Sequence, residues 1–111
     1  MRWSPDLRTH CIGLAVVLMA IYGQSLSFPF QFDDGHSIVQ NPHVRSLANV
    51  PSFFLDASMF SVDASLTMYR PLVLTSYAFN YAVSGQDPWS YHLANMVLHF
   101  LTSIAVGVLA R

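Results

Sequence analysis

Two long apolar stretches, one near each end of the chain, define its organisation. The first runs without interruption from Cys11 to Tyr22 and continues to Phe30 with only neutral polar residues in between. At about 1.5 Å per residue, such a stretch can cross a hydrocarbon core of about 30 Å as a helix. It predicts a transmembrane helix over residues 11–27, preceded by a short N-terminal segment, residues 1–10.

A cleaved secretory signal is the alternative interpretation of the first stretch. Arg2 and Arg8 would form its basic region, the apolar run its hydrophobic region, and Ser25-Leu26-Ser27 a cleavage site of small residues. The residues of this stretch alone leave both interpretations open.

The second stretch, residues 90–110, carries no formal charge and predicts a second transmembrane helix. Asp87 is expected to cap this helix with Pro88 at its first position, and Trp89 and Tyr91 suit the aromatic belt of a membrane interface. A second span is hard to reconcile with a secreted soluble product, so it also favours a retained first helix.

The arginines predict how the chain is oriented. Arg2 and Arg8 precede the first span and Arg111 follows the second, whereas residues 28–89 hold only Arg45 and Arg70 among five aspartates. Positive residues concentrate on the cytoplasmic side of a membrane. We therefore expect an integral protein of the bacterial inner membrane or the ER membrane, with both termini cytoplasmic and the loop periplasmic or lumenal.

The loop between the spans is expected to contain short helices. Pro51 begins one that reaches about Leu55, and Pro71 begins another over about residues 71–84, which Ser84-Gly85 ends. The second is apolar enough to lie in the membrane interface. A β-strand over residues 73–81, which are rich in β-forming and aromatic residues, is the alternative. The predicted fold class is a mainly α membrane protein with two transmembrane helices flanking an external loop with short interfacial helices.

Composition narrows the function. The chain is 53% hydrophobic and 10% charged, and that charged share is well under half of the ~25% of an ordinary soluble domain. A net charge of −1 argues against a nucleic-acid partner. The single cysteine, Cys11, lies in the first apolar stretch, so there is no disulfide framework and no cysteine-based metal site.

Two adjacent carboxylates, Asp33 and Asp34, follow the first span. Such a pair can bind a divalent cation through oxygen, or one carboxylate can act as a general base while the other orients it. Asp-Asp-Gly is also a common turn sequence. The pair is therefore a candidate catalytic site and a candidate metal site, with an ordinary turn as the alternative.

Arg70 lies directly before the helix that Pro71 is expected to begin, and Tyr69 precedes it. A helix N-terminus offers free N–H groups and a positive dipole end, so an arginine beside it is a candidate phosphate-binding site. Pairing of Arg70 with a loop aspartate or with lipid headgroups is the alternative.

Four polar residues of the second span, His92, Asn95, His99 and Ser103, fall on one helical face. Polar groups are costly in hydrocarbon and normally turn toward other helices or a wet cavity, so this stripe predicts more membrane helices than the two of this chain. A zinc site from His92 and His99 is a poor alternative because two turns, or about 10 Å, separate them.

Four short motifs occur in a characteristic order. They are Phe32-Asp33-Asp34, Ile38-Val39-Gln40-Asn41-Pro42-His43-Val44-Arg45, Tyr69-Arg70-Pro71-Leu72, and Asp87-Pro88-Trp89-Ser90-Tyr91-His92-Leu93-Ala94-Asn95 with His99. In these motifs the chain resembles the N-terminal part of the transmembrane and tetratricopeptide-repeat-containing O-mannosyltransferases and their bacterial relatives, which are polytopic proteins of the GT-C glycosyltransferase superfamily. The resemblance extends over about residues 28–109.

The resemblance implies an enzyme that transfers a sugar from a polyprenyl-phosphate carrier to a Ser or Thr hydroxyl of an acceptor protein. The family's acidic pair falls on Asp33 and Asp34, one of which would deprotonate the acceptor, and Arg70 becomes a candidate partner of the carrier phosphate. The matching residues His92, Asn95 and His99 are expected to be structural.

This chain departs from the family in size. It lacks the many further membrane helices and the repeat domain of the family, so we expect a fragment without transferase activity of its own. A non-enzymatic two-span subunit or scaffold that binds other membrane proteins is the alternative.

Overall fold

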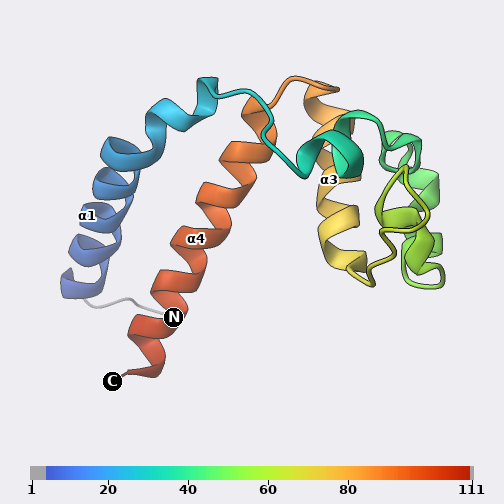
Figure 1. The fold of residues 1–111 in the computed structure, drawn as a ribbon. Coiled ribbons are helices and arrows are strands. Elements are labelled where there is room, and N and C mark those ends of the chain that lie inside the picture. The colour runs from blue at the N-terminus through green and yellow to red at the C-terminus, as the bar shows by residue number, and fades with distance from the viewer. Residues whose placement is uncertain (1–4, 111) are drawn as a thin grey trace.

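The computed structural model describes residues 5–110, and within this range its ordered segments are helices and helical turns. Two long helices, α1 (Pro5–Tyr22) and α4 (Trp89–Leu109), run in opposite directions beside each other (Figure 1). The residues between them emerge at one end of this pair. The predictions made for Arg2 and Arg111 lie outside the described residues.

The first helix begins earlier than the sequence predicts. It starts at Pro5 instead of Cys11, because proline suits the first turn and the side chains of Thr9 and His10 bond to the carbonyl oxygens of Pro5 and Asp6. At Tyr22 the helix tightens into the 3-10 helix η1 (Gly23–Ser27), which ends before Phe28. Residues 5–27 therefore form one continuous helical segment.

The predicted cap of the second long helix is wrong. Helix α4 begins at Trp89 with Pro88 in the N-cap position, and no side chain caps it. The carbonyl of Pro88 accepts the backbone N–H of His92 at 3.2 Å, which is the first hydrogen bond of the helix and fits the N-cap position of Pro88. Asp87 lies in the turn that precedes it.

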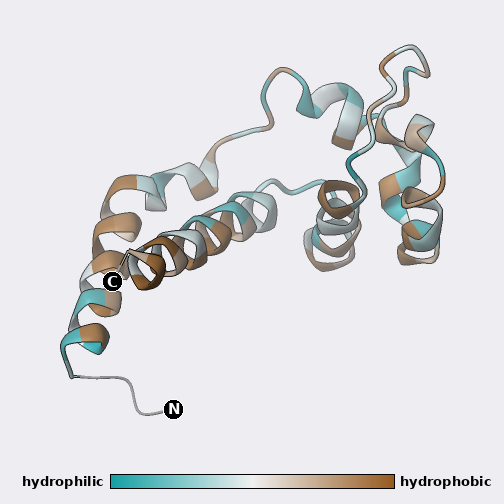
Figure 2. Ribbon diagram, turned by 90° about the horizontal axis from the view of Figure 1, so that it is seen from below, coloured by the Kyte–Doolittle hydropathy of each residue, from teal (hydrophilic) through white to brown (hydrophobic). Residues whose placement is uncertain are grey.

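Both long helices contain long hydrophobic stretches (Figure 2), and many of their large apolar side chains are exposed. Each is long and apolar enough to cross a membrane, yet only 6% of the apolar window of the first and 0% of that of the second are buried inside the protein. A core helix of a soluble protein would be mostly buried, and a signal sequence would account only for the first. The chain is a mainly α-helical integral membrane protein, as its sequence predicts.

The third helix, α3 (Pro71–Ser84), confirms the prediction of a helix that Pro71 begins, and the β-strand alternative is wrong. It lies antiparallel to the first half of α4 (Figure 1). Gly85 ends it with φ of 61°, which favours glycine because a Cβ is strained there. Leu72, Phe79 and Val83 are exposed, and Phe79 and Val83 line an open groove between α3 and α4. A position of α3 in the membrane interface stays a prediction.

A small core joins α3 to the rest of the loop. The expected short helix at Pro51 is α2 (Val50–Phe53), and its Phe53 packs with Leu74 and Ala78 of α3. Short helical turns surround this core and carry further buried residues. They are η2 (Gly35–Val39), η3 (Pro42–Arg45), η4 (Leu47–Asn49) and η5 (Ala57–Phe60), and Val44 and Phe60 complete the core.

Candidate functional site

The two aspartates form part of a tight turn, and the structure gives them different surroundings. The carboxylate of Asp34 accepts the backbone N–H of Gln31 at 3.1 Å, so it closes the turn. The carbonyl of Asp33 accepts both the backbone N–H and the hydroxyl of Ser37, at 3.2 and 2.8 Å. The carboxylate of Asp33, which is 95% exposed, remains available for chemistry.

The residue before the pair adopts an unusual backbone conformation. Phe32 has φ of 41° and its side chain is 98% exposed. A left-handed conformation is costly for a bulky residue and tends to occur at functional sites. The turn that presents Asp33 is therefore held by its surroundings and is not the lowest-energy conformation of this segment.

Asp33 and Arg70 line the same cavity, although they lie far apart in the sequence. This cavity, which we call the Asp33 cavity, has a volume of about 690 Å³. Asp33 and His36 come from the segment between α1 and α2, Arg70 directly precedes α3, and Tyr77 lies in the middle of α3. The remaining lining residues are Ser37, Phe60 and residues 65–68.

The guanidinium of Arg70 is held by an aromatic ring and not by an acid. Its central carbon lies 5.7 Å from the centroid of the Phe60 ring, a cation–π distance. Among the described residues it has neither an ion pair nor a hydrogen bond, so pairing with a loop aspartate is not seen. Its N–H donors are thus free to bind an anion in the Asp33 cavity.

Tyr69 is not brought into this cavity. Its hydroxyl donates to the carbonyl of Phe54 at 3.0 Å, and its side chain does not line the Asp33 cavity. The arrangement therefore gives no support to a direct contact between Tyr69 and a phosphate bound beside Arg70.

Tyr77 also lines the Asp33 cavity. Burial, with a smaller contribution from the negative charge of Asp34, raises the pKa of Tyr77 above its ordinary value. Its hydroxyl therefore stays protonated at neutral pH. Sequence reasoning missed Tyr77 as well as His36, because neither lies in a pattern that predicts a site.

Asn41 joins the two sides of the cavity wall. It is fully buried, and its side-chain N–H groups are shared among the carbonyl oxygens of Ser37, Met59 and Phe60 at 3.0–3.2 Å. Its side-chain oxygen accepts the backbone N–H of His43 at 3.1 Å. A residue that the sequence marks only as part of a turn before proline thus fixes Phe60 against the segment that follows Asp33.

The first turn of α4 holds the chain that leads to Asp33. The ring of Tyr91 packs edge-on against Phe30 at 5.0 Å, and its hydroxyl donates to the carbonyl of Gly85 at 3.0 Å. His92 Nε2 lies 2.9 Å from the carbonyl oxygen of Phe28. Ser90 lies 2.6 Å from the hydroxyl of Ser84. These contacts give the motif at the start of α4 a structural role.

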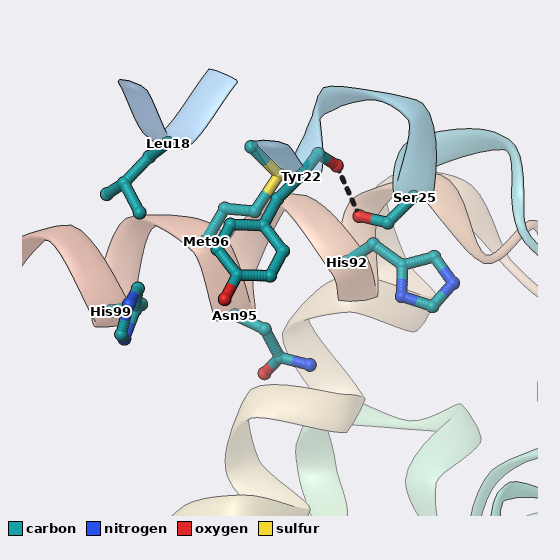
Figure 3. A pocket seen from close by; sticks show the side chains of 7 residues that line it. All are labelled: Leu18, Tyr22, Ser25, His92, Asn95, Met96 and His99. Carbon is teal, nitrogen blue, oxygen red and sulfur yellow. Dashed lines mark hydrogen bonds between the residues drawn. The ribbon is translucent and has the colours of Figure 1, made fainter. Parts of the chain in front are cut away.

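The polar stripe of α4 faces α1. His92, Asn95 and His99 line a groove of about 280 Å³ together with Tyr22 and Ser25 of the first helical segment (Figure 3). The ring of His99 meets that of Tyr22 edge-on at 6.0 Å. The first helical segment of this chain therefore lies against part of the polar stripe. Further membrane helices beside it stay a prediction.

A metal centre is not evident in residues 5–110. No group of three or more His, Cys, Asp or Glu side chains within this range could hold a metal ion. Asp33 and Asp34 also differ in orientation, since only Asp33 lines the cavity. A divalent cation bound by this pair stays a prediction.

Comparison with known proteins reveals clear relatives. The chain is 36% identical over 86 residues to the mouse protein O-mannosyl-transferase TMTC2, an alignment covering 73% of this chain and 10% of the relative. Identity to human TMTC3 is 33% over 91 residues, covering 79% and 10%. Identity to Drosophila melanogaster Tmtc1 is 34% over 104 residues, covering 91% and 12%.

The chain spans about a tenth of the length of these curated relatives. No family profile and no solved structure matches it. A relationship to bacterial members of the family stays a prediction.

Proposed function

Because this chain belongs to the family of the TMTC protein O-mannosyl-transferases, we propose that it is the N-terminal part of a membrane glycosyltransferase. That enzyme transfers a sugar from a polyprenyl-phosphate carrier to a Ser or Thr hydroxyl of a protein. One observation carries the proposal: the exposed carboxylate of Asp33 and the guanidinium of Arg70, which has no acidic partner among the described residues, line one cavity.

Asp33 is the general base of this reaction. Its carboxylate takes the proton of the acceptor hydroxyl while the hydroxyl oxygen attacks the anomeric carbon of the sugar. The bond between that carbon and the phosphate oxygen breaks, and the carrier phosphate leaves with the electron pair. Attack from the face opposite the phosphate inverts the anomeric centre. Asp34 keeps the turn closed, since its carboxylate already accepts the N–H of Gln31.

Arg70 stabilises the departing phosphate. Negative charge grows on that group as the glycosidic bond breaks, and a cation that is already in place stabilises it. The Phe60 ring holds the guanidinium without consuming its N–H donors. The amphipathic α3 beside it lies where membrane lipid and the carrier can approach, in keeping with its exposed apolar face.

The loop faces the periplasm or the ER lumen, and the chain alone is inactive. Only ten of the described residues line its cavity of about 690 Å³, so the cavity is only partly enclosed. A transferase must hold donor and acceptor together and exclude water. We propose that the remaining walls and the site for the acceptor protein come from parts of a longer protein, as the greater length of the relatives suggests.

Variants of the longer protein that carries this segment test the proposal. Asp33→Asn should lower sugar transfer by at least about 100-fold, because general-base catalysis contributes about 10²- to 10⁴-fold. Arg70→Gln should lower it similarly, with membrane insertion unchanged. Asp87→Asn is the matched control, since Asp87 lies in the turn before α4 and does not line the cavity. Full transfer by Asp33→Asn would refute Asp33 as the general base and favour a non-catalytic role for this segment.

A further inference from the structure

His36 connects the carboxylate of Asp33 to a buried hydroxyl. Its Nε2 lies 3.6 Å from Asp33 Oδ1, and its Nδ1 lies 2.9 Å from the hydroxyl oxygen of Ser61. The His36 side chain is 25% exposed, while Ser61 is only 2% exposed. Its ring also meets the Phe60 ring edge-on at 6.2 Å, so the imidazole is fixed on two sides.

The contacts of Ser61 favour one tautomer of His36. The Ser61 oxygen accepts the backbone N–H of Asp63 at 3.0 Å and lies 2.9 Å from Nδ1 of His36 and 3.5 Å from the carbonyl oxygen of His36. Donation of the Ser61 hydroxyl over the shorter contact makes Nδ1 the acceptor and leaves the hydrogen of the neutral imidazole on Nε2. This tautomer is part of the proposal that follows, and in it the donor nitrogen is the one that lies 3.6 Å from Asp33 Oδ1.

Among the described residues, the imidazole of His36 is the only hydrogen-bond donor that could orient the Asp33 carboxylate. This carboxylate is 95% exposed and, within the described part of the chain, His36 is the only side chain that forms an ion pair or hydrogen-bond contact with it. A freely rotating base spends little time aimed at its acceptor, and a small error in geometry lowers the rate strongly. A contact of 3.6 Å becomes a hydrogen bond after a small rotation, as often happens when substrate binds.

We propose that His36, held by Ser61, is a positioning residue that orients the Asp33 carboxylate for proton abstraction. The inference rests on the proposed role of Asp33. One carboxylate oxygen is held by the Nε2–H of His36, and the other is directed into the Asp33 cavity toward the acceptor hydroxyl. The histidine takes no proton from the substrate, so its loss changes the rate and not the chemistry.

Two substitutions separate the two contacts of His36. The amide nitrogen of glutamine reaches the place of Nε2, and that of asparagine the place of Nδ1. In the longer transferase, His36→Asn should keep the bond to Ser61 and lower kcat by about 10- to 100-fold with KM unchanged. His36→Gln should regain most of kcat, although it loses the bond to Ser61. Equal kcat values for the two variants would overturn the inference.

The same variants distinguish a failure of this inference from a failure of the proposed function. If Asp33→Asn kept full activity, Asp33 would not be the base and the proposed function itself would fail. If Asp33→Asn were inactive while His36→Asn had the kcat of the unaltered enzyme, only the role of His36 would fail.

A measurement that does not depend on enzyme activity tests which nitrogen of His36 carries the hydrogen. Nitrogen chemical shifts of the imidazole, recorded on this chain in detergent micelles, should show neutral His36 with hydrogen on Nε2, and Ser61→Ala should remove that preference. Hydrogen on Nδ1 in the unaltered chain would overturn the inference.

Discussion

At the scale of single residues, Asn41 does the most to shape the site. Its side chain fills a buried position and satisfies carbonyl oxygens from two segments that are separated in the sequence. A buried carbonyl that loses its donor costs about 1–3 kcal/mol. The wall of the Asp33 cavity therefore depends on one amide group.

Asn41→Ala should accordingly lower the free energy of unfolding by about 3 kcal/mol, because several buried groups lose their partners together. Denaturant unfolding of the chain in detergent micelles would measure the change. Asn49→Ala is the matched control, since Asn49 makes a single side-chain bond, to the carbonyl of His43 at 2.9 Å, and should cost only about 1 kcal/mol. Equal losses for the two variants would contradict the proposed importance of Asn41.

The turn at Asp63, beside the cavity, should respond to acid. The hydroxyl of Ser65, followed by its backbone N–H, donates to the carboxylate at 2.6 and 2.9 Å and holds the pKa of Asp63 below its ordinary value of 3.8. A lowered pKa in the folded state means that the stabilisation is present above 3.8 and is lost as pH falls through the folded value. The turn should therefore loosen only in strong acid.

An NMR titration of the Asp63 carboxyl carbon checks this expectation. Its midpoint should lie below 3.8 in the unaltered chain and rise toward the ordinary value in Ser65→Ala. Ser58→Ala, which removes the equivalent hydroxyl beside Asp56, is the control and should leave the Asp63 midpoint where it was. An unchanged midpoint in Ser65→Ala would show that the hydroxyl does not hold the charge.

At the scale of elements, the end of α3 decides how this helix meets α4. The φ of 61° and ψ of −123° at Gly85 allow the chain to reverse, so that Ser84 and Ser90 come within 2.6 Å. Gly85→Ala should lower the unfolding free energy by about 1–3 kcal/mol because this conformation is strained for any residue with a Cβ. Thermal unfolding in micelles would measure the loss.

Gly35→Ala serves as the control for that substitution. A Cβ at Gly35 meets open space and its φ is not in the left-handed region. It should therefore change stability by much less than Gly85→Ala. If both variants lost the same stability, the backbone conformation at Gly85 would not be the cause.

The sequence predicts the helices better than their ends. Both long helices and α3 follow from contiguous apolar residues bounded by proline or glycine, which are local signals. The start of α1 at Pro5 and the uncapped start of α4 were not predicted, because an end depends on which carbonyl and N–H groups find partners. Asp87 had the right residue type for a cap but lies outside the first turn.

The candidate site could be predicted in part. Asp33 and Arg70 attract attention individually, as an acid beside a span and a base beside a helix start. Their shared cavity could not be foreseen, because it depends on Asn41 bringing distant segments together. His36 carries no signal of its own, since its contact with Ser61 joins residues 25 positions apart.

At the scale of the whole molecule, the antiparallel pair of α1 and α4 constrains the position of the site. Because the two helices run in opposite directions (Figure 1), residues 28–88 leave them at the same end, and the Asp33 cavity must lie on one side of the membrane. The arginines near the two ends of the chain outnumber those of the loop, which predicts that the loop lies on the side away from the cytoplasm. A lipid-linked donor bound by Arg70 would then meet acceptor proteins that have already been translocated.

A single introduced cysteine tests that orientation, since Cys11 is the only natural one. With Cys11→Ser as background, Ser65→Cys on the exposed loop should react with a membrane-impermeant maleimide added to intact cells or to sealed ER vesicles of inverted sidedness. Cys11→Ser without the new cysteine should stay unlabelled, and permeabilisation should not increase the labelling of Ser65→Cys. Reaction only after permeabilisation would place the loop in the cytosol, where the cavity would face the wrong compartment for the proposed transfer.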